Sequence, residues 1–332
     1  MAKLANNNIY FFLIVIIYFI FIFSYDFTQS RDFYNYTDWY YFTVENDIGS
    51  YLAIKDPMFF ILSKISHFFS VGVIGVVVFY ILVSLWAKLK ILSVLNVSAS
   101  VFILFFVFYF CRFFILLEGT QFRAAVAVPL ATLGVIYYLH GCKRSALFLF
   151  SVSVIFHLSA LVIFLFLILS HIISKSKKSI AMIIYLSMLF FAIFFKFDMS
   201  ILLNFPFLGD RIADYINGDY EVTALSLFNT YLFFKVILFT IIFSSCSLMY
   251  DEKIFVFASM SFFGMLLFVF FREIDSFALR LHELFALFDA LLFAYATRAF
   301  NQKSRFLYVA VSLPLLAIFL NSSLSVLNIN AN

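Results

Sequence analysis

The sequence has few charged residues. Asp, Glu, Lys and Arg make up 12% of its 332 residues, whereas a soluble domain of this size carries roughly 25%. Hydrophobic residues make up 65%, and 52 residues are Phe. Because one globular core cannot hide so many Phe side chains, many of them must face lipid. The composition therefore excludes a soluble globular protein and predicts an integral membrane protein, with a mean hydropathy of +1.07.

Cysteine and basic tracts are scarce as well. Cys111, Cys142 and Cys246 are far apart and form no C-x-x-C pair, which argues against a disulfide framework or a zinc site. No basic tract is longer than Lys177–Lys178, and the sequence has no stripe of interleaved Arg and aromatic residues, so we expect no nucleic-acid partner. No paired-Asp motif stands out. We therefore expect no metal and no cofactor.

Long apolar runs recur along the whole chain. A helix that crosses a bilayer needs roughly 20 mostly apolar residues. The first run follows Lys3 without a small-residue cleavage site, which predicts an uncleaved signal anchor. Together the runs predict spans near residues 8–24, 71–87, 97–117, 124–140, 179–195, 228–248, 254–271, 281–297 and 305–321.

Two further segments are apolar but of unusual length. Residues 57–69 are short, and Pro57 suits the start of a helix, so they predict an interfacial or re-entrant helix. Residues 145–171 are too long for one ordinary span and too short for two. If the basic residues at 143–144 and 175–178 lie on the same inner side, this segment must enter and return as a re-entrant helical hairpin. One long tilted span is the alternative, and it would move every later loop to the other side.

We therefore expect an all-α, polytopic membrane helix bundle of about ten spans, forming a single transmembrane domain over residues 1–332. With the N-terminus inside, the outer loops are 25–56, 196–227 and 271–283. These loops are rich in Asp, Tyr and Arg. Acidic and aromatic side chains together resemble carbohydrate sites, and the Arg fork grips phosphate. Ordinary solvated loops with interfacial aromatic residues are the alternative.

Several ionisable residues lie in or beside predicted spans. His157 lies at the middle of the 145–171 segment, and an intramembrane ionisable group is a functional candidate by default. Arg123 precedes the span at 124–140, where it acts either as a phosphate clamp or as an interfacial anchor paired with Glu118. Arg112 lies about one turn inside the outer end of its span and fits either role.

A second group of candidates opens the span near residue 281. Arg280, His282 and Glu283 occur within one helical turn. Arg280 and Glu283 share a helix face at i and i+3, so they can pair, and the pair can be either structural or functional.

Four segments in order resemble the EpsG/Wzy-type family of bacterial polysaccharide polymerases. They are RDFYNYTDWYYF (31–42), KDPMFFILSKI (55–65), the block QFRAAVAVPLATLGVIYYLHGCKRSALFLFSVSVIFHLSALVIF (121–164) and ALRLHELFALF (278–288). The resemblance implies an O-antigen or related polysaccharide polymerase of the bacterial inner membrane, with its active site facing the periplasm. Such an enzyme transfers a growing glycan from undecaprenyl pyrophosphate to the non-reducing end of a lipid-linked repeat unit.

This resemblance also implies partners and roles. The expected partners are an undecaprenyl-pyrophosphate-linked oligosaccharide, the lipid bilayer and a chain-length regulator protein. Arg123 and Arg280, with Arg112 as a third candidate, would stabilise the charge of the leaving pyrophosphate. His157 is the first candidate for the base, followed by Glu283 or Asp32. The expected substrate-binding residues are Asp32, Tyr36, Asp38, Arg112, Arg211 and His282.

Two other functions stay open. One is a glycosyltransferase that uses polyprenyl-phosphate sugars, with Asp32 or Asp38 as the base. The other is a lipid-linked oligosaccharide flippase, which should need a larger and more symmetric set of helices around a charged central cavity. Because the charge here gathers at one face, the sequence favours an enzyme.

Overall fold

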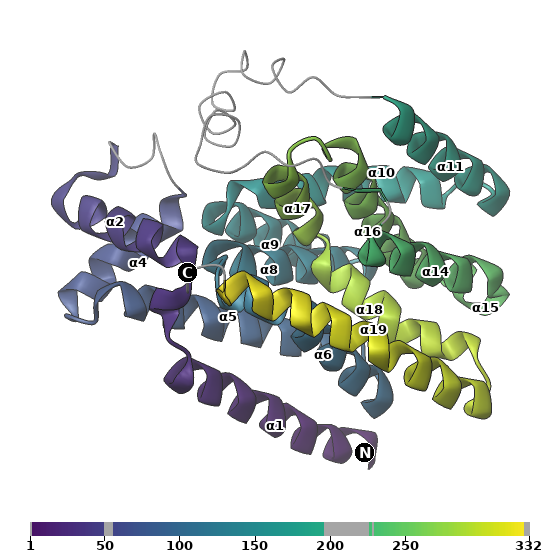
Figure 1. Cartoon of the computed structure of the whole chain (residues 1–332), viewed down its shortest axis with the longest axis horizontal. Coiled ribbons are helices and arrows are strands. Elements are labelled where there is room, and N and C mark those ends of the chain that lie inside the picture. Colours follow the sequence, from purple (N-terminus) through teal and green to yellow (C-terminus); the bar gives the residue numbers. More distant parts are fainter. Residues whose placement is uncertain (1, 50–55, 196–225, 228, 329–332) are drawn as a thin grey trace. The chain divides into compact units, whose positions relative to one another are not determined.

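The structure is a computed structural model that describes residues 2–49, 56–195, 226–227 and 229–328. These residues form helices joined by short connections and contain no β-strand (Figure 1). The chain divides into two compact units. The first comprises residues Met1–Phe164 and Phe293–Asn332, and the second comprises Leu165–Leu292. Each is described by itself below.

The first unit is built around α8 (Phe122–Leu139), whose residues are almost all buried from Phe122 to Ile136. It packs between α5 (Gly72–Val94) and α9 (Lys143–Phe156). Small residues on α8 allow this close approach. At Gly134, for example, a Cβ would lie 3.2 Å from the Phe150 ring of α9.

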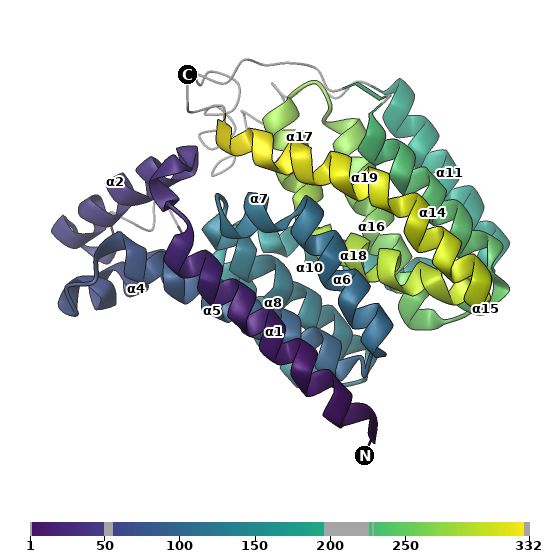
Figure 2. The ribbon, with the colours of Figure 1, turned by 60° about the horizontal axis from the view of Figure 1, so that its bottom comes forward.

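The remaining helices of this unit surround that core. Figure 2 shows α1 (Ala2–Ser24) running along α5 and α6 (Ala99–Arg112). The short helix α7 (Phe114–Glu118) leads from α6 to α8, and α19 (Gln302–Asn328) packs against α6 and α7. At one end, α2 (Arg31–Glu45) packs on α4 (Pro57–Phe68), which packs on α5.

The second unit is centred on α16 (Glu252–Phe270), which is buried along most of its length. Asp251 caps its N-terminus by accepting hydrogen bonds from the backbone N–H groups of Lys253 and Ile254. Its neighbours are α11 (Lys178–Phe194), α14 (Thr230–Ser244), α15 (Cys246–Met249) and α17 (Asp275–Glu283). Two helices, α10 (Leu161–Ser174) and α18 (Ala286–Ala296), are shared between the units.

The helices confirm a polytopic membrane bundle. Within the described residues, four helices are long and apolar enough to cross a bilayer: Gly72–Val94, Phe122–Leu139, Glu252–Phe270 and Gln302–Ser325. Five shorter apolar helices accompany them: Ile9–Ser24, Ala99–Arg112, Leu158–Ser174, Lys178–Phe194 and Thr230–Ser244. Large apolar side chains are exposed along many of these helices, as lipid-facing surfaces require.

The structure confirms that the chain turns back within residues 145–171, and the expectation that this hairpin is re-entrant in the membrane stays a prediction. Helix α9 ends at Phe156, His157 has extended backbone (φ −159°, ψ 114°), and α10 begins at Leu161. The rings of Phe150 and Phe164, seven residues on either side of His157, lie 5.2 Å apart. In a continuous helix their Cα atoms would be separated by about 21 Å. The chain therefore turns back at His157.

Two details differ from the sequence expectation. Residues 25–56 were expected to be a loop, but they contain α2, which buries Phe33, Tyr36, Tyr40 and Thr43 along one face. Polar residues lie between these buried positions, so the sequence of α2 does not show a clear helical pattern of apolar residues. The run at 97–117 is interrupted, because α6 ends at Arg112 and α7 begins at Phe114.

Candidate functional site

Three helix ends converge in the first unit. Asp56 is the N-cap residue of α4, Arg123 lies in the first turn of α8, and His157 is the C-cap residue of α9. Pro57 occupies the first position of α4, where its fixed φ favours the start of a helix. The Asp56 side chain makes no capping hydrogen bond to α4. It is therefore available to the other two helix ends.

The Asp56 carboxylate joins these ends. Its Oδ2 lies 2.5 Å from Nη1 of Arg123 and 3.3 Å from Nδ1 of His157. Its Oδ1 accepts a hydrogen bond of 3.2 Å from the backbone N–H of Leu158. One carboxylate thus fixes a cation, an imidazole and the backbone at the tip of the hairpin.

The charge of Asp56 is strongly favoured despite its burial. Burial alone would raise its pKa, but the Arg123 charge, the His157 side chain and the Leu158 N–H hold the pKa of Asp56 well below its usual range. The N-termini of α4 and α8, which carry partial positive charge, act in the same direction. Asp56 is therefore an anion throughout the physiological pH range.

Two aromatic residues of α2 flank Arg123. The guanidinium carbon lies 4.7 Å from the centre of the Trp39 ring and 5.7 Å from that of Tyr36. The Tyr36 hydroxyl oxygen accepts from the backbone N–H of Arg123 at 3.3 Å and from its Nε at 3.4 Å. Burial raises the pKa of Tyr36, so this hydroxyl is neutral. The guanidinium is thus oriented by a carboxylate, a hydroxyl and an aromatic face.

The members of this cluster differ in their exposure to the surface. The side chain of Asp56 is 2% exposed, whereas those of Arg123 and His157 are 15% and 25% exposed. The cation and the imidazole can therefore reach a ligand while the carboxylate stays behind them. This arrangement can neutralise an anionic group and exchange a proton at neighbouring points.

The structure brings together only some of the predicted site residues. Arg123, His157 and Tyr36 share this cluster. Asp32 lies one turn before Tyr36 on α2, near enough for its charge to raise the Tyr36 pKa. Asp38 is exposed on α2.

The other predicted residues belong to other elements. Arg112 ends α6, where it is buried with its guanidinium over the rings of Phe113 and Phe319 at 5.7 and 5.8 Å. Arg280, His282 and Glu283 form the last turn of α17 in the second unit. Arg211 lies outside the described residues.

Sequence reasoning missed Asp56 and Trp39 and gave Arg123 the wrong partner. Arg123 pairs with Asp56, whereas the expected partner Glu118 pairs with Lys88. The available signal was the Asp-Pro pair at residues 56–57, because an acidic residue before a helix-starting Pro stands at a fixed helix end. Asp56 is 67 residues from Arg123, so no local pattern reveals the contact.

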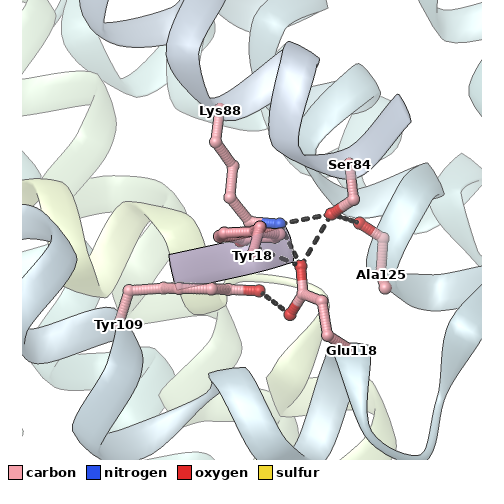
Figure 3. A network of polar contacts seen from close by, with 6 residues as sticks. All are labelled: Tyr18, Ser84, Lys88, Tyr109, Glu118 and Ala125. Carbon is pink, nitrogen blue, oxygen red and sulfur yellow. Dashed lines mark hydrogen bonds and ion pairs between the residues drawn. The ribbon is translucent and has the colours of Figure 1, made fainter. Parts of the chain in front are cut away.

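Glu118 belongs to a second polar cluster, which reaches α8 at Ala125, two residues after Arg123 (Figure 3). Its Oε1 lies 2.5 Å from Nζ of Lys88 and accepts from Ser84 at 2.8 Å, and its Oε2 accepts from Tyr109 at 2.5 Å. The Ser84 hydroxyl also lies 2.6 Å from the carbonyl oxygen of Ala125, in the first turn of α8. The cluster therefore ties α5, α6 and α7 to the turn that carries Arg123.

A third buried cluster lies in the second unit. Lys235 of α14 and Asp289 of α18 form an ion pair of 3.0 Å, and both are fully buried. The hydroxyls of Tyr231 and Ser261 donate to Asp289, and His282 Nε2 lies 3.6 Å from it. His282, expected to bind substrate, is thus fully buried in this cluster. Isolated charges within apolar runs are the signal that indicates such a cluster.

The described residues contain no group of three or more His, Cys, Asp or Glu side chains that could hold a metal ion. The expectation that the protein needs no metal stays a prediction.

A comparison with protein families finds one match that covers nearly the whole chain. The family described as the EpsG family matches residues 9–331. No curated protein and no solved structure matches the chain.

Proposed function

The chain belongs to the EpsG family, and from this membership we propose that it is a membrane glycosyltransferase that polymerises polysaccharide. Its donor is a growing glycan on undecaprenyl pyrophosphate, and its acceptor is the non-reducing end of a lipid-linked repeat unit of O-antigen or a related polysaccharide. The enzyme acts in the bacterial inner membrane with its site facing the periplasm, and a chain-length regulator protein is a further partner.

The convergence of Asp56, Arg123 and His157 carries this proposal. These residues come from three segments that are distant in sequence. Of the three side chains, Asp56 is the buried one, and it contacts both Arg123 and His157. A purely structural ion pair would need neither a partly exposed imidazole nor an aromatic platform beneath the cation. The combination fits a reaction with an anionic leaving group and a hydroxyl nucleophile.

The reaction needs one bond formed, one broken and one proton moved. The acceptor hydroxyl oxygen attacks the anomeric carbon of the donor glycan, and the bond between that carbon and the pyrophosphate oxygen breaks. Undecaprenyl pyrophosphate leaves with the bonding electrons, and Arg123 stabilises its charge. The hydroxyl proton passes to His157, which acts as the general base.

Asp56 prepares His157 for this role. When Nδ1–H donates to the ionised Asp56 carboxylate at 3.3 Å, Nε2 keeps its lone pair and can accept the proton. The carboxylate then stabilises the imidazolium that forms, as in other Asp–His pairs. Asp56 is thus a positioning residue, because it acts through His157 and Arg123.

Trp39 and Tyr36 supply the second part of the chemistry, which is recognition of the glycan. Aromatic faces stack on the apolar faces of sugar rings, and the Trp39 ring is partly exposed beside Arg123. A sugar next to this ring places its pyrophosphate near the guanidinium. The same site would suit a polyprenyl-phosphate sugar, for which Asp32 or Asp38 is the expected base. Asp38 is exposed on α2, whereas Asp32 lies one turn before Tyr36.

Arg123→Lys tests the proposal. Purified protein in lipid nanodiscs is supplied with lipid-linked repeat units, and the products are separated on a gel. Lys keeps the charge but not the fork, so we expect a loss of about 10²–10³ in rate, the cost of one transition-state donor. The matched control is Arg305→Lys, whose guanidinium bonds to backbone carbonyls of Thr297 and Phe300, and it should polymerise normally.

The same variant distinguishes an enzyme from a flippase in cells. Loss of a polymerase leaves a single capped repeat in place of a ladder, whereas loss of a flippase leaves no repeat at all. A full ladder from Arg123→Lys at matched protein level would remove Arg123 from the chemistry. Absence of all surface repeats in this variant would favour the flippase.

A further inference from the structure

A basic groove lies at the other end of α8 from Arg123. It has a volume of about 400 Å³ and is lined by residues of α5, α8 and α9, among them Trp86, Lys90, Tyr137 and Arg144. Tyr137 is 14 residues after Arg123 on the same helix, a rise of about 21 Å. The groove is therefore separate from the candidate active site.

The groove gathers positive charge that no carboxylate among the described residues balances. Lys90 and Arg144 come from different helices and line the same hollow. The sequence has no acidic residue between Asp56 and Glu118 or between Glu118 and Asp198, and Glu118 is bound to Lys88. In the part of the chain that the structure describes, no carboxylate pairs with Lys90 or Arg144. A ligand that enters this groove meets two cations that no described carboxylate neutralises.

The start of α9 adds to this field. Lys143 and Arg144 occupy its first turn, where no acidic residue and no capping side chain is present. Cations are unfavourable at the positive end of a helix dipole. The described protein groups do not offset this cost. An anion bound beside Arg144 would do so.

The walls of the groove show what kind of anion fits. The Trp86 side chain is 52% exposed and that of Phe148 is 67% exposed, and both belong to helices of the membrane bundle. Trp and Tyr beside Lys and Arg are typical of the headgroup level of a membrane protein. A free inorganic anion would contact only the basic part of the hollow, whereas a phospholipid also covers its apolar wall.

We propose that this groove binds an anionic phospholipid, with the headgroup phosphate against Lys90 and Arg144 and the acyl chains along Trp86 and Phe148. Basic pockets between transmembrane helices bind anionic headgroups in this way. The location, about 21 Å along α8 from the proposed catalytic cluster, favours a membrane phospholipid over the lipid-linked substrate. The choice of a phospholipid over the lipid-linked substrate rests on the proposed function, whereas the anionic character of the ligand does not.

The two Trp residues of the chain provide a direct assay. Trp39→Phe leaves Trp86 as the only Trp, so its fluorescence reports on the groove alone. This variant is reconstituted into phosphatidylcholine vesicles that contain a small fraction of lipid with brominated acyl chains, which quench Trp on contact. We expect brominated phosphatidylglycerol to quench Trp86 at a much lower fraction than brominated phosphatidylcholine.

Charge removal then tests the named residues. In the same background, Lys90→Gln and Arg144→Gln should each lower the preference for phosphatidylglycerol about fivefold, and together about 25-fold, because each cation near an anionic membrane surface contributes about that factor. The control is Lys175→Gln with Lys303→Gln, which removes two exposed cations elsewhere and should leave the preference unchanged.

Three outcomes would overturn the proposal. The first is equal quenching by the two brominated lipids, or a preference that survives the double substitution. The second is displacement of brominated phosphatidylglycerol by an equal amount of undecaprenyl phosphate, which would assign the groove to the glycan carrier. The third is displacement by millimolar inorganic phosphate, which would show a site for a free anion.

Discussion

Replacing Asp56 with Asn changes one heavy atom and removes the negative charge of the carboxylate that joins Arg123 and His157. The amide keeps the size of the carboxylate. It can still accept one hydrogen bond from Arg123, but it no longer balances the guanidinium charge at 2.5 Å or attracts a proton onto His157 at 3.3 Å. The substitution therefore tests the charge of Asp56 and its orienting effect on Arg123 and His157, while the packing of the side chain stays nearly the same.

The expected loss of activity can be bounded. Replacing the carboxylate that orients a catalytic histidine costs on the order of 10⁴ in rate where the histidine is tightly held. Here the contact with His157 is longer, and that side chain is 25% exposed. We therefore expect a smaller loss, of about 10²–10³, for Asp56→Asn. Asp56→Glu keeps the charge and should recover part of the rate.

The effect on stability should be modest. A hydrogen bond to a charged group contributes about 1.5–3 kcal/mol, and the Asn oxygen retains part of the contact with Arg123. Asp56→Asn should therefore accumulate in the membrane and unfold in detergent at a moderately lower temperature. The matched control is Asp47→Asn, an exposed carboxylate just after α2, which should match the parent protein in both rate and melting temperature.

The lowered pKa of Asp56 gives a pH test with a definite sign. Its folded-state pKa lies below that of the unfolded chain, which is about 3.9, because Arg123 and His157 outweigh burial. The ionised group therefore contributes its full stability above about pH 5 and loses it as the pH falls below about 4. The difference in melting temperature between parent and Asp56→Asn should shrink as the pH falls below about 4.

Two results would refute this reasoning. One is normal polymerisation by Asp56→Asn at matched protein level, which would mean that the carboxylate does not position the base. The other is a melting-temperature difference that stays the same down to pH 3, which would mean that Asp56 is not held as an anion by its neighbours.

Three further predictions follow from the sequence and the fold. The native thiol of Cys142, exposed at the turn before α9, should react with a membrane-impermeant maleimide only from the cytoplasmic side; reaction from the periplasm would invert the predicted orientation. Purified protein should polymerise lipid-linked repeats in excess EDTA, because Arg123 supplies the charge that a divalent ion otherwise would; an absolute need for added magnesium would reject this. Arg280→Lys should accumulate normally yet yield almost no long chains if Arg280 grips pyrophosphate as a fork, with a loss of about 10²–10³ in rate; near-normal chain length would leave it only a structural role.

The helices were largely predictable because lipid imposes one rule along the whole chain. A segment that crosses a bilayer must be long, apolar and helical, and each of these properties is local in sequence. The tip at His157 was predictable for the same reason, since basic residues on both sides of an apolar segment of intermediate length force a return. Helix α2 was missed because it buries only one face, and its Asp and Tyr residues resemble those of a loop.

The contacts of the candidate site were not predictable to the same degree. Residue types alone pointed to Arg123, His157 and Tyr36, because a cation, an imidazole and an aromatic ring suit a pyrophosphate-linked sugar. The shared partner of Arg123 and His157, Asp56, required the packing of α4 against α9, which brings together residues 101 positions apart. Proximity in sequence pointed instead to Glu118, whose charge is satisfied elsewhere.

The ion pair between Lys88 and Glu118 provides a last test, of how the bundle holds the turn that carries Arg123. Both side chains are fully buried at 2.5 Å. Lys88→Met leaves Glu118 with hydroxyl donors from Tyr18, Ser84 and Tyr109, whereas Glu118→Leu leaves the ammonium with one hydroxyl and an aromatic ring. Breaking a buried pair costs about 3–5 kcal/mol, so we expect Glu118→Leu at the upper end of that range and Lys88→Met at or below the lower end. The double variant should be more stable than Glu118→Leu alone, because it buries no unpaired charge. Melting temperatures in detergent complete this double-mutant cycle, and strictly additive losses would show that the two charges do not stabilise each other.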